Sequence, residues 1–74
     1  MIAVTTVKDN TVINIELFAE KNERDAWRYF FSEMRDNGGE IVDGVHEAHV
    51  IDQQEWESND ETCHIQLHRL GVSA

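Results

Sequence analysis

The chain has 74 residues and a formal net charge of −9, from 15 Asp and Glu against 6 Lys and Arg. This length predicts one small acidic domain over residues 1–74, and the charge argues against direct binding to nucleic acid or to an anionic membrane surface. The single cysteine excludes an internal disulfide scaffold and is typical of a reducing compartment.

The chain is expected to be a folded cytoplasmic protein. Its first ten residues, MIAVTTVKDN, lack the basic start and long apolar run of a signal peptide. No segment approaches the roughly 18 apolar residues of a membrane-spanning helix. Hydrophobic residues nevertheless make up 41% of the chain and recur in periodic blocks, which is not typical of a disordered acidic tail.

The N-terminal quarter predicts a β-hairpin. Residues 2–7 (IAVTTV) are mostly β-branched or apolar, which favours a strand, and Lys8-Asp9-Asn10 is a turn signal. Residues 11–18 then alternate with a period of two, with Ile13, Ile15 and Leu17 on one face. Two antiparallel strands joined by a short turn are the simplest interpretation.

The next segment predicts an amphipathic helix. Asn22 is a candidate cap, and Asp25, three residues later, resembles the acid of a capping box. Apolar residues then recur at spacings of three and four, which predicts one apolar stripe. The stripe consists of Ala26, Trp27, Phe30, Phe31 and Met34. Gly38 provides a natural left-handed stop.

The C-terminal half predicts two more strands. Residues 40–51 are strand-like but alternate poorly, which a bulge near Gly44 or burial on both faces would explain. Residues 52–60 form a polar connection, and residues 62–70 alternate clearly. The predicted fold is therefore α+β, in the order ββαββ, with a four-stranded antiparallel sheet and one helix packed across one face.

This fold assigns the two sheet faces different roles. The helix stripe is expected to pack on one face, formed by Ile13, Ile15, Leu17, Ile65 and Leu67. One helix covers about one face, so the other face stays open for a second subunit or a partner. A domain of this size has a small core, which also favours a homodimer.

The segment from Asp36 to Glu61, called here the acidic segment, has nine carboxylates and no Lys or Arg. They are Asp36, Glu40, Asp43, Glu47, Asp52, Glu55, Glu57, Asp60 and Glu61. Local cations cannot neutralise them, so two interpretations stay open. The carboxylates either form a solvated surface that maintains solubility, or they mimic the closely spaced charges of duplex DNA, about one per 1.7 Å of axis.

Trp56 lies inside this segment, between Glu55 and Glu57. An aromatic ring rimmed by acids suits the centre of a protein–protein interface. Equally, the ring would fit as a cap over the end of a small core. On the first interpretation, the partner-binding residues are Glu40, Asp43, Glu47, Asp52, Glu55, Trp56, Glu57, Asp60 and Glu61.

The four histidines do not have a metal-binding spacing. His46 and His49 are expected on one strand and point to opposite faces. His64 and His68 share a face of the next strand but lie roughly 13 Å apart. A site would need a cross-strand pair such as His49 with His64, plus a carboxylate. We therefore predict no metal and no cofactor.

No catalytic motif is apparent. Cys63 alternates with Ile65 and Leu67, which predicts a buried thiol of low reactivity. The sequence has no serine elbow, glycine-rich phosphate loop or HExxH motif. We expect a protein without enzyme activity.

These observations predict an inhibitor that places an acidic, nucleic-acid-mimicking surface on a basic site of a nucleic-acid-handling protein. Phage counter-defence factors, such as anti-restriction and anti-CRISPR proteins, are often of this size and charge, and an acidic antitoxin is a variant of the same hypothesis. Two rivals stay open. One is a self-assembling accessory protein that buries Ile41, Val45 and Ile51 between subunits; the other is a histidine-based metal-binding protein.

Overall fold

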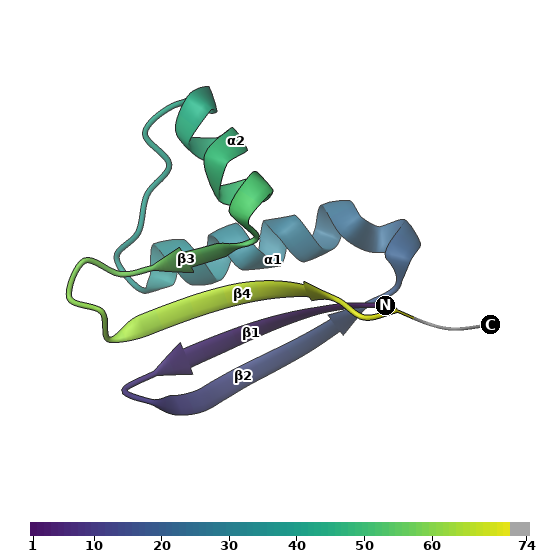
Figure 1. Cartoon of the computed structure of the whole chain (residues 1–74), viewed down its shortest axis with the longest axis horizontal. Coiled ribbons are helices and arrows are strands. Elements are labelled where there is room, and N and C mark those ends of the chain that lie inside the picture. The colour runs from purple at the N-terminus through teal and green to yellow at the C-terminus, as the bar shows by residue number, and fades with distance from the viewer. Residues whose placement is uncertain (72–74) are drawn as a thin grey trace.

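The computed structural model describes residues 1–71 and contains one four-stranded antiparallel sheet with helices on one side (Figure 1). In chain order the elements are β1 (Ile2–Lys8), β2 (Thr11–Phe18), the 3-10 helix η1 (Glu20–Asn22), α1 (Glu23–Asp36), α2 (Gly44–Gln53), β3 (Glu55–Glu57) and β4 (Cys63–Arg69). The strand order is β2-β1-β4-β3. The predicted α+β class and antiparallel sheet are confirmed, and α2 is an addition to the predicted architecture.

The predicted β-hairpin is confirmed. β1 and β2 pair antiparallel across a turn at Asp9 and Asn10, whose φ angles are 52° and 64°. Two consecutive residues with positive φ are typical of the tight turns that suit twisted strands, and Asp and Asn tolerate this conformation well. On its other edge β1 pairs with β4, so these two strands form the centre of the sheet.

The core lies between α1 and the two central strands. The helix buries Ala26, Trp27, Phe30 and Met34, as the apolar stripe predicts. These side chains form one cluster with Ile2 and Val4 of β1 and Cys63, Ile65 and Leu67 of β4. The predicted contribution of Ile65 and Leu67 to the core is therefore confirmed.

The predicted contribution of Ile13, Ile15 and Leu17 to the same core is wrong. These side chains are 54%, 57% and 56% exposed, and they lie on the sheet face that α1 does not cover, called here the outer face. The strand register explains the difference, because it sets the even-numbered residues of β2 beside the buried residues of β1. The pairs are Ile2–Phe18, Val4–Glu16 and Thr6–Asn14.

A hydrogen-bond network makes the polar side of β2 compatible with the helix. Glu33 Oε1 of α1 accepts from Thr6 Oγ1 at 3.2 Å, from Asn14 Nδ2 at 3.0 Å and from the Tyr29 hydroxyl at 3.0 Å. Asn14 Nδ2 also donates to the Tyr29 hydroxyl. Thr6 is completely buried, so its hydroxyl needs this partner. Hydrogen bonds thus join α1 to the middle of β2, and at the end of the strand the Phe18 ring packs on that of Tyr29, with their centroids 5.9 Å apart.

Tyr29 is expected to ionise at unusually high pH. Partial burial and the hydrogen bond to Glu33 raise the pKa of Tyr29 to about 12 from 10.0. Between these values the folded chain keeps a proton that the unfolded chain has released, so the free energy of unfolding should fall as the pH rises. Tyr29 is the single tyrosine, so tyrosinate absorbance reports it alone. A folded-state midpoint near 10, or an unchanged pH dependence of unfolding in Tyr29→Phe, would contradict this prediction.

The sequence predicts a capping interaction at each end of α1, and the structure has only the C-terminal one. Asn22 occupies the predicted N-cap position, but its side chain makes no capping hydrogen bond, and the preceding turn is the 3-10 helix η1. The C-terminal stop is confirmed: Gly38 has a φ of +88°. Gly38 N donates to Arg35 O at 3.1 Å and Gly39 N to Met34 O at 2.8 Å, which is the pattern of a Schellman motif.

The strand predicted for residues 40–51 is wrong, since most of it forms α2. Asp43 begins this helix by accepting a hydrogen bond from His46 N at 2.8 Å, and Gln54 ends it with a φ of 60°. Val50 is the one buried residue of α2, so its apolar residues need not alternate along the segment. The predicted connection over residues 52–60 contains β3. Neither helix of residues 1–71 is long and apolar enough to cross a membrane.

Candidate partner-binding surface

The carboxylates of the acidic segment lie on the surface of the molecule. Glu40 lies in the loop before α2, and Asp43 lies at the first turn of that helix. The other predicted acids are Glu47 and Asp52 on α2, Glu55 and Glu57 on β3, and Asp60 and Glu61 in the turn before β4. All eight side chains are exposed. The sequence-predicted acids thus occupy a helix, a strand and two loops, and not the single row of a strand.

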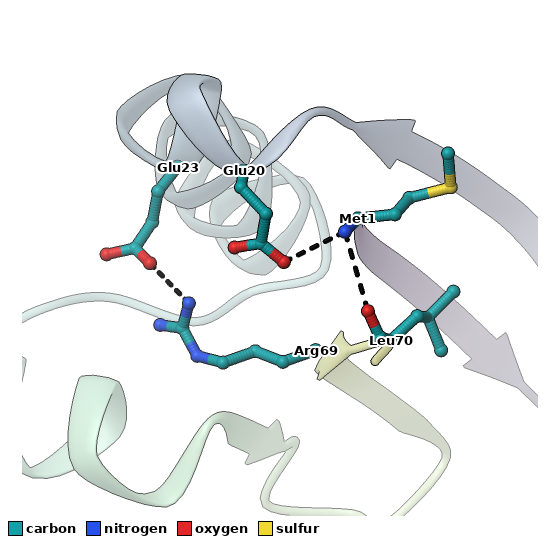
Figure 2. A network of polar contacts seen from close by, with 5 residues as sticks. All are labelled: Met1, Glu20, Glu23, Arg69 and Leu70. Carbon is teal, nitrogen blue, oxygen red and sulfur yellow. Dashed lines mark hydrogen bonds and ion pairs between the residues drawn. The ribbon is translucent and has the colours of Figure 1, made fainter. Parts of the chain in front are cut away.

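Within residues 1–71, none of these carboxylates forms an ion pair. The two ion pairs of this part of the chain lie where both of its ends meet (Figure 2). There the N-terminal ammonium contacts Glu20 at 2.8 Å, and Arg69 contacts Glu23. The hydrogen bond from the ammonium lowers the pKa of Glu20. Two cations are therefore held by acids that lie outside the acidic segment.

A cleft of about 540 Å³ lies at the other end of the molecule, beside the C-terminal end of α1. It is bounded by the loop after α1, the first turn of α2 and the turn between β3 and β4. Its lining residues are Asn37, Gly38, Gly39, Glu40, Val42, His46, Trp56, Ser58, Asn59 and Asp60. Of the predicted partner-binding residues, the cleft brings together Glu40, Trp56 and Asp60.

Trp56 both completes the core and lines the cleft. It pairs with Ile65 across β3 and β4, and its half-buried ring packs on the core cluster. Gly39 makes room for it, because a Cβ there would lie 2.5 Å from Trp56 Cζ2 and 2.6 Å from Met34 Cγ. The interpretation of Trp56 as a cap of the core is thus confirmed. Its role as an interface anchor stays a prediction.

Gly39→Ala is expected to lower the free energy of unfolding by about 1–3 kcal/mol, because the added methyl overpacks the Trp56–Met34 contact. The emission of Trp56 should shift as well, which is measurable in a Trp27→Phe background. Gly38→Ala is the matched control. A Cβ at Gly38 meets nothing within 4 Å, so its cost comes from the positive φ and leaves Trp56 in place. Equal emission shifts in both variants would contradict the proposed packing.

Two of the predicted acids have local structural roles. Asp43 caps α2, as described above. Asp60 Oδ1 accepts from Ser58 Oγ at 2.7 Å, Thr62 Oγ1 at 2.8 Å and Thr62 N at 3.2 Å, and these hydrogen bonds lower the pKa of Asp60. The other six side chains make no hydrogen bond within residues 1–71. They are Glu40, Glu47, Asp52, Glu55, Glu57 and Glu61.

The histidines lie on two different elements. The prediction that His46 and His49 share a strand is wrong, since both are on α2. His46 Nδ1 accepts from Val42 N at 3.3 Å, which holds the ring at the cleft. His64 and His68 share the outer face of β4, as predicted, and His68 Nε2 lies 3.2 Å from Thr5 Oγ1. Residues 1–71 contain no group of three or more His, Cys, Asp or Glu side chains placed to hold one metal ion.

Cys63 is buried, as its place in the alternation predicts. It is 2% exposed, and burial raises the pKa of its thiol. A raised pKa leaves less thiolate at neutral pH and so lowers nucleophilicity. Cys63 therefore contributes to the core.

The cleft also includes residues that the sequence pattern does not indicate, namely His46, Asn37 and Asn59. Two loops rich in Asn, Ser and Gly mark its position, but only the fold brings them together. Comparison of the chain with protein families, curated proteins and solved structures finds no match. The chemistry of this surface is therefore the basis for a functional proposal.

Proposed function

We propose that the chain is a non-enzymatic inhibitor that binds a basic, nucleic-acid-contacting site on another protein. One observation carries this proposal: six of the eight predicted partner-binding carboxylates are exposed and have neither an ion pair nor a hydrogen bond within residues 1–71. Internal pairing does not require these charges, and a partner rich in Lys and Arg would be attracted to them over several ångströms.

The arrangement supports a binding mode that resembles the backbone of a nucleic acid. Glu55 and Glu57 are two residues apart on one side of β3, roughly 6.8 Å along the strand. Glu47 and Asp52 extend the negative surface along α2. Carboxylates on rigid elements keep their spacing, so a groove that holds phosphates meets several fixed charges at once.

The cleft supplies a recess beside these charges. Glu40 and Asp60 are acidic and Trp56 presents an aromatic surface, all on its lining. An arginine or lysine of the partner can pair with a carboxylate there and stack on the indole, a favourable arrangement for a desolvated cation. The class of partner is thus a nucleic-acid-handling enzyme, as in phage counter-defence against restriction or CRISPR systems.

The test is capture of partners by the immobilised chain from nuclease-treated lysate, followed by elution with a duplex oligonucleotide. The proposal expects a nucleic-acid-binding protein that the oligonucleotide releases and that rising salt also removes. Partners that resist both treatments, or recovery of the bait alone, would count against it.

A further inference from the structure

The outer face has an apolar strip that nothing in residues 1–71 covers. Val12, Ile13, Ile15 and Leu17 of β2 are each between 54% and 57% exposed. They belong to an ordered strand of eight residues, β2, which pairs with β1 along its length except at a bulge, where Ile13 has no partner on β1. On the opposite side of the same strand, Asn14 is hydrogen-bonded to α1 and Phe18 packs on Tyr29. Four neighbouring aliphatic side chains in one ordered strand mark an interaction surface.

The charge of this face indicates which partner fits it. The outer side chains of β1 and β2 are all uncharged, and β4 adds His64, Gln66 and His68. On a chain of net charge −9, the outer side chains of these three strands carry no carboxylate, and the carboxylates of this face lie at its β3 edge, where Glu55 and Glu57 stand beside Gln66 and His64. A cationic partner finds no counter-charge here. Two copies of this chain can meet through it without opposing their carboxylates.

We infer that the outer face is covered by a second copy of the same chain in a symmetric dimer. In a two-fold contact, the same apolar strip is used by both copies. The two contacting surfaces therefore have equal area, twist and polarity. Three strands of seven or eight residues span roughly 25 × 15 Å, which is at the small end for a specific interface. The dimer is therefore expected to dissociate in a concentration-dependent way.

This inference is independent of the proposed inhibitor function. α2 stands beyond β3, at the edge of the sheet opposite β2 (Figure 1). A dimer through the outer side chains of β2 and β1 therefore leaves α2 and the cleft open to another partner, and Glu55 and Glu57 lie on the same face but at its far edge, on β3. The rival contact through Ile41, Val45 and Ile51 is different, because Ile41 and Ile51 already pack on the core.

The test is the mass of the full chain by sedimentation equilibrium, from low micromolar to near-millimolar concentration. The wild-type mass should rise from 8.6 kDa toward twice that value. Ile15→Asn with Leu17→Asn should hold it at 8.6 kDa with unchanged far-ultraviolet circular dichroism. Glu16→Asn, on the opposite side of the same strand, should behave as wild type. The melting temperature should rise with concentration in wild type and control, but not in the double variant.

A constant wild-type mass of 8.6 kDa at every concentration would overturn the inference, and it would do so even if the double variant failed to fold. The same result is expected if the outer face belongs to a different protein. Equal association of the double variant and the wild type would also overturn it, since the contact would then lie elsewhere.

Discussion

Phe30→Ala is expected to lower the free energy of unfolding by about 3–5 kcal/mol, because Phe30 is completely buried and its loss leaves a cavity beneath α1. The ring lies 5.0 Å from that of Trp27 and 5.5 Å from that of Phe31, between centroids. A domain of this length has a total stability of roughly 4–11 kcal/mol. Urea unfolding followed by circular dichroism should therefore show a much lower midpoint, with part of the population unfolded without denaturant.

Phe31→Ala is the matched control for that substitution. Phe31 is the next residue on the same helix, but it is only half-buried at the margin of the core. Its removal should cost less than half as much as removal of Phe30. Equal losses in the two variants would contradict the orientation of α1 on the sheet.

Removal of three carboxylates from the acidic segment is expected to weaken partner binding roughly 3-fold to 100-fold. The variant combines Glu40→Gln, Glu47→Gln and Asp52→Asn, three exposed side chains without an internal partner. Each exposed pair with a cation contributes about 0.2–1 kcal/mol, and a tenfold change in affinity corresponds to about 1.4 kcal/mol. Titration against the captured partner at low and high salt measures the effect, which should shrink as the salt concentration rises.

The matched control removes the same charge from elsewhere. Asp9→Asn, Glu16→Gln and Asp25→Asn also change the net charge from −9 to −6, and none of these three acids belongs to the acidic segment. Affinity should change little in the control if position matters. An equal loss in both triple variants would show that total charge alone attracts the partner, and no loss in either would refute the role of the acidic segment.

The elements with a clear period were predictable from the sequence. The alternation of residues 11–18 and the apolar stripe of α1 indicated a strand and a helix correctly. Alternation defines two faces, however, and it does not say which face the helix covers. On β2 the apolar face is the exposed one, because Asn14 joins the hydrogen-bond network of Glu33 and Tyr29 on the other side.

α2 was not predictable from its apolar residues. It buries only Val50, and Val45 is 80% exposed, so neither a helical nor a strand period stands out. α2 begins after Asp43, which caps it, but an Asp followed by Gly is equally typical of a turn and so does not by itself predict a helix. A helix this short depends on contacts made by the rest of the fold, which a local pattern does not contain.

The candidate surface was predictable in part. Carboxylates are rarely buried without a partner, so their exposure follows from composition. The distribution of these carboxylates over α2, β3 and two loops does not follow from composition, because it depends on where the chain turns. The cleft depends on a contact between Gly39 and Trp56, which are 17 positions apart, and no pairing signal in the sequence indicates it.

The most direct test of the acidic surface is a competition experiment. The captured nucleic-acid-handling protein is bound to labelled duplex DNA, and the chain is added at increasing concentration while fluorescence anisotropy is recorded. The proposed function predicts that the chain displaces the DNA, that more DNA requires proportionally more chain, and that the triple variant Glu40→Gln, Glu47→Gln, Asp52→Asn is weaker. A complex in which DNA and the chain are bound together without mutual exclusion would contradict nucleic-acid mimicry.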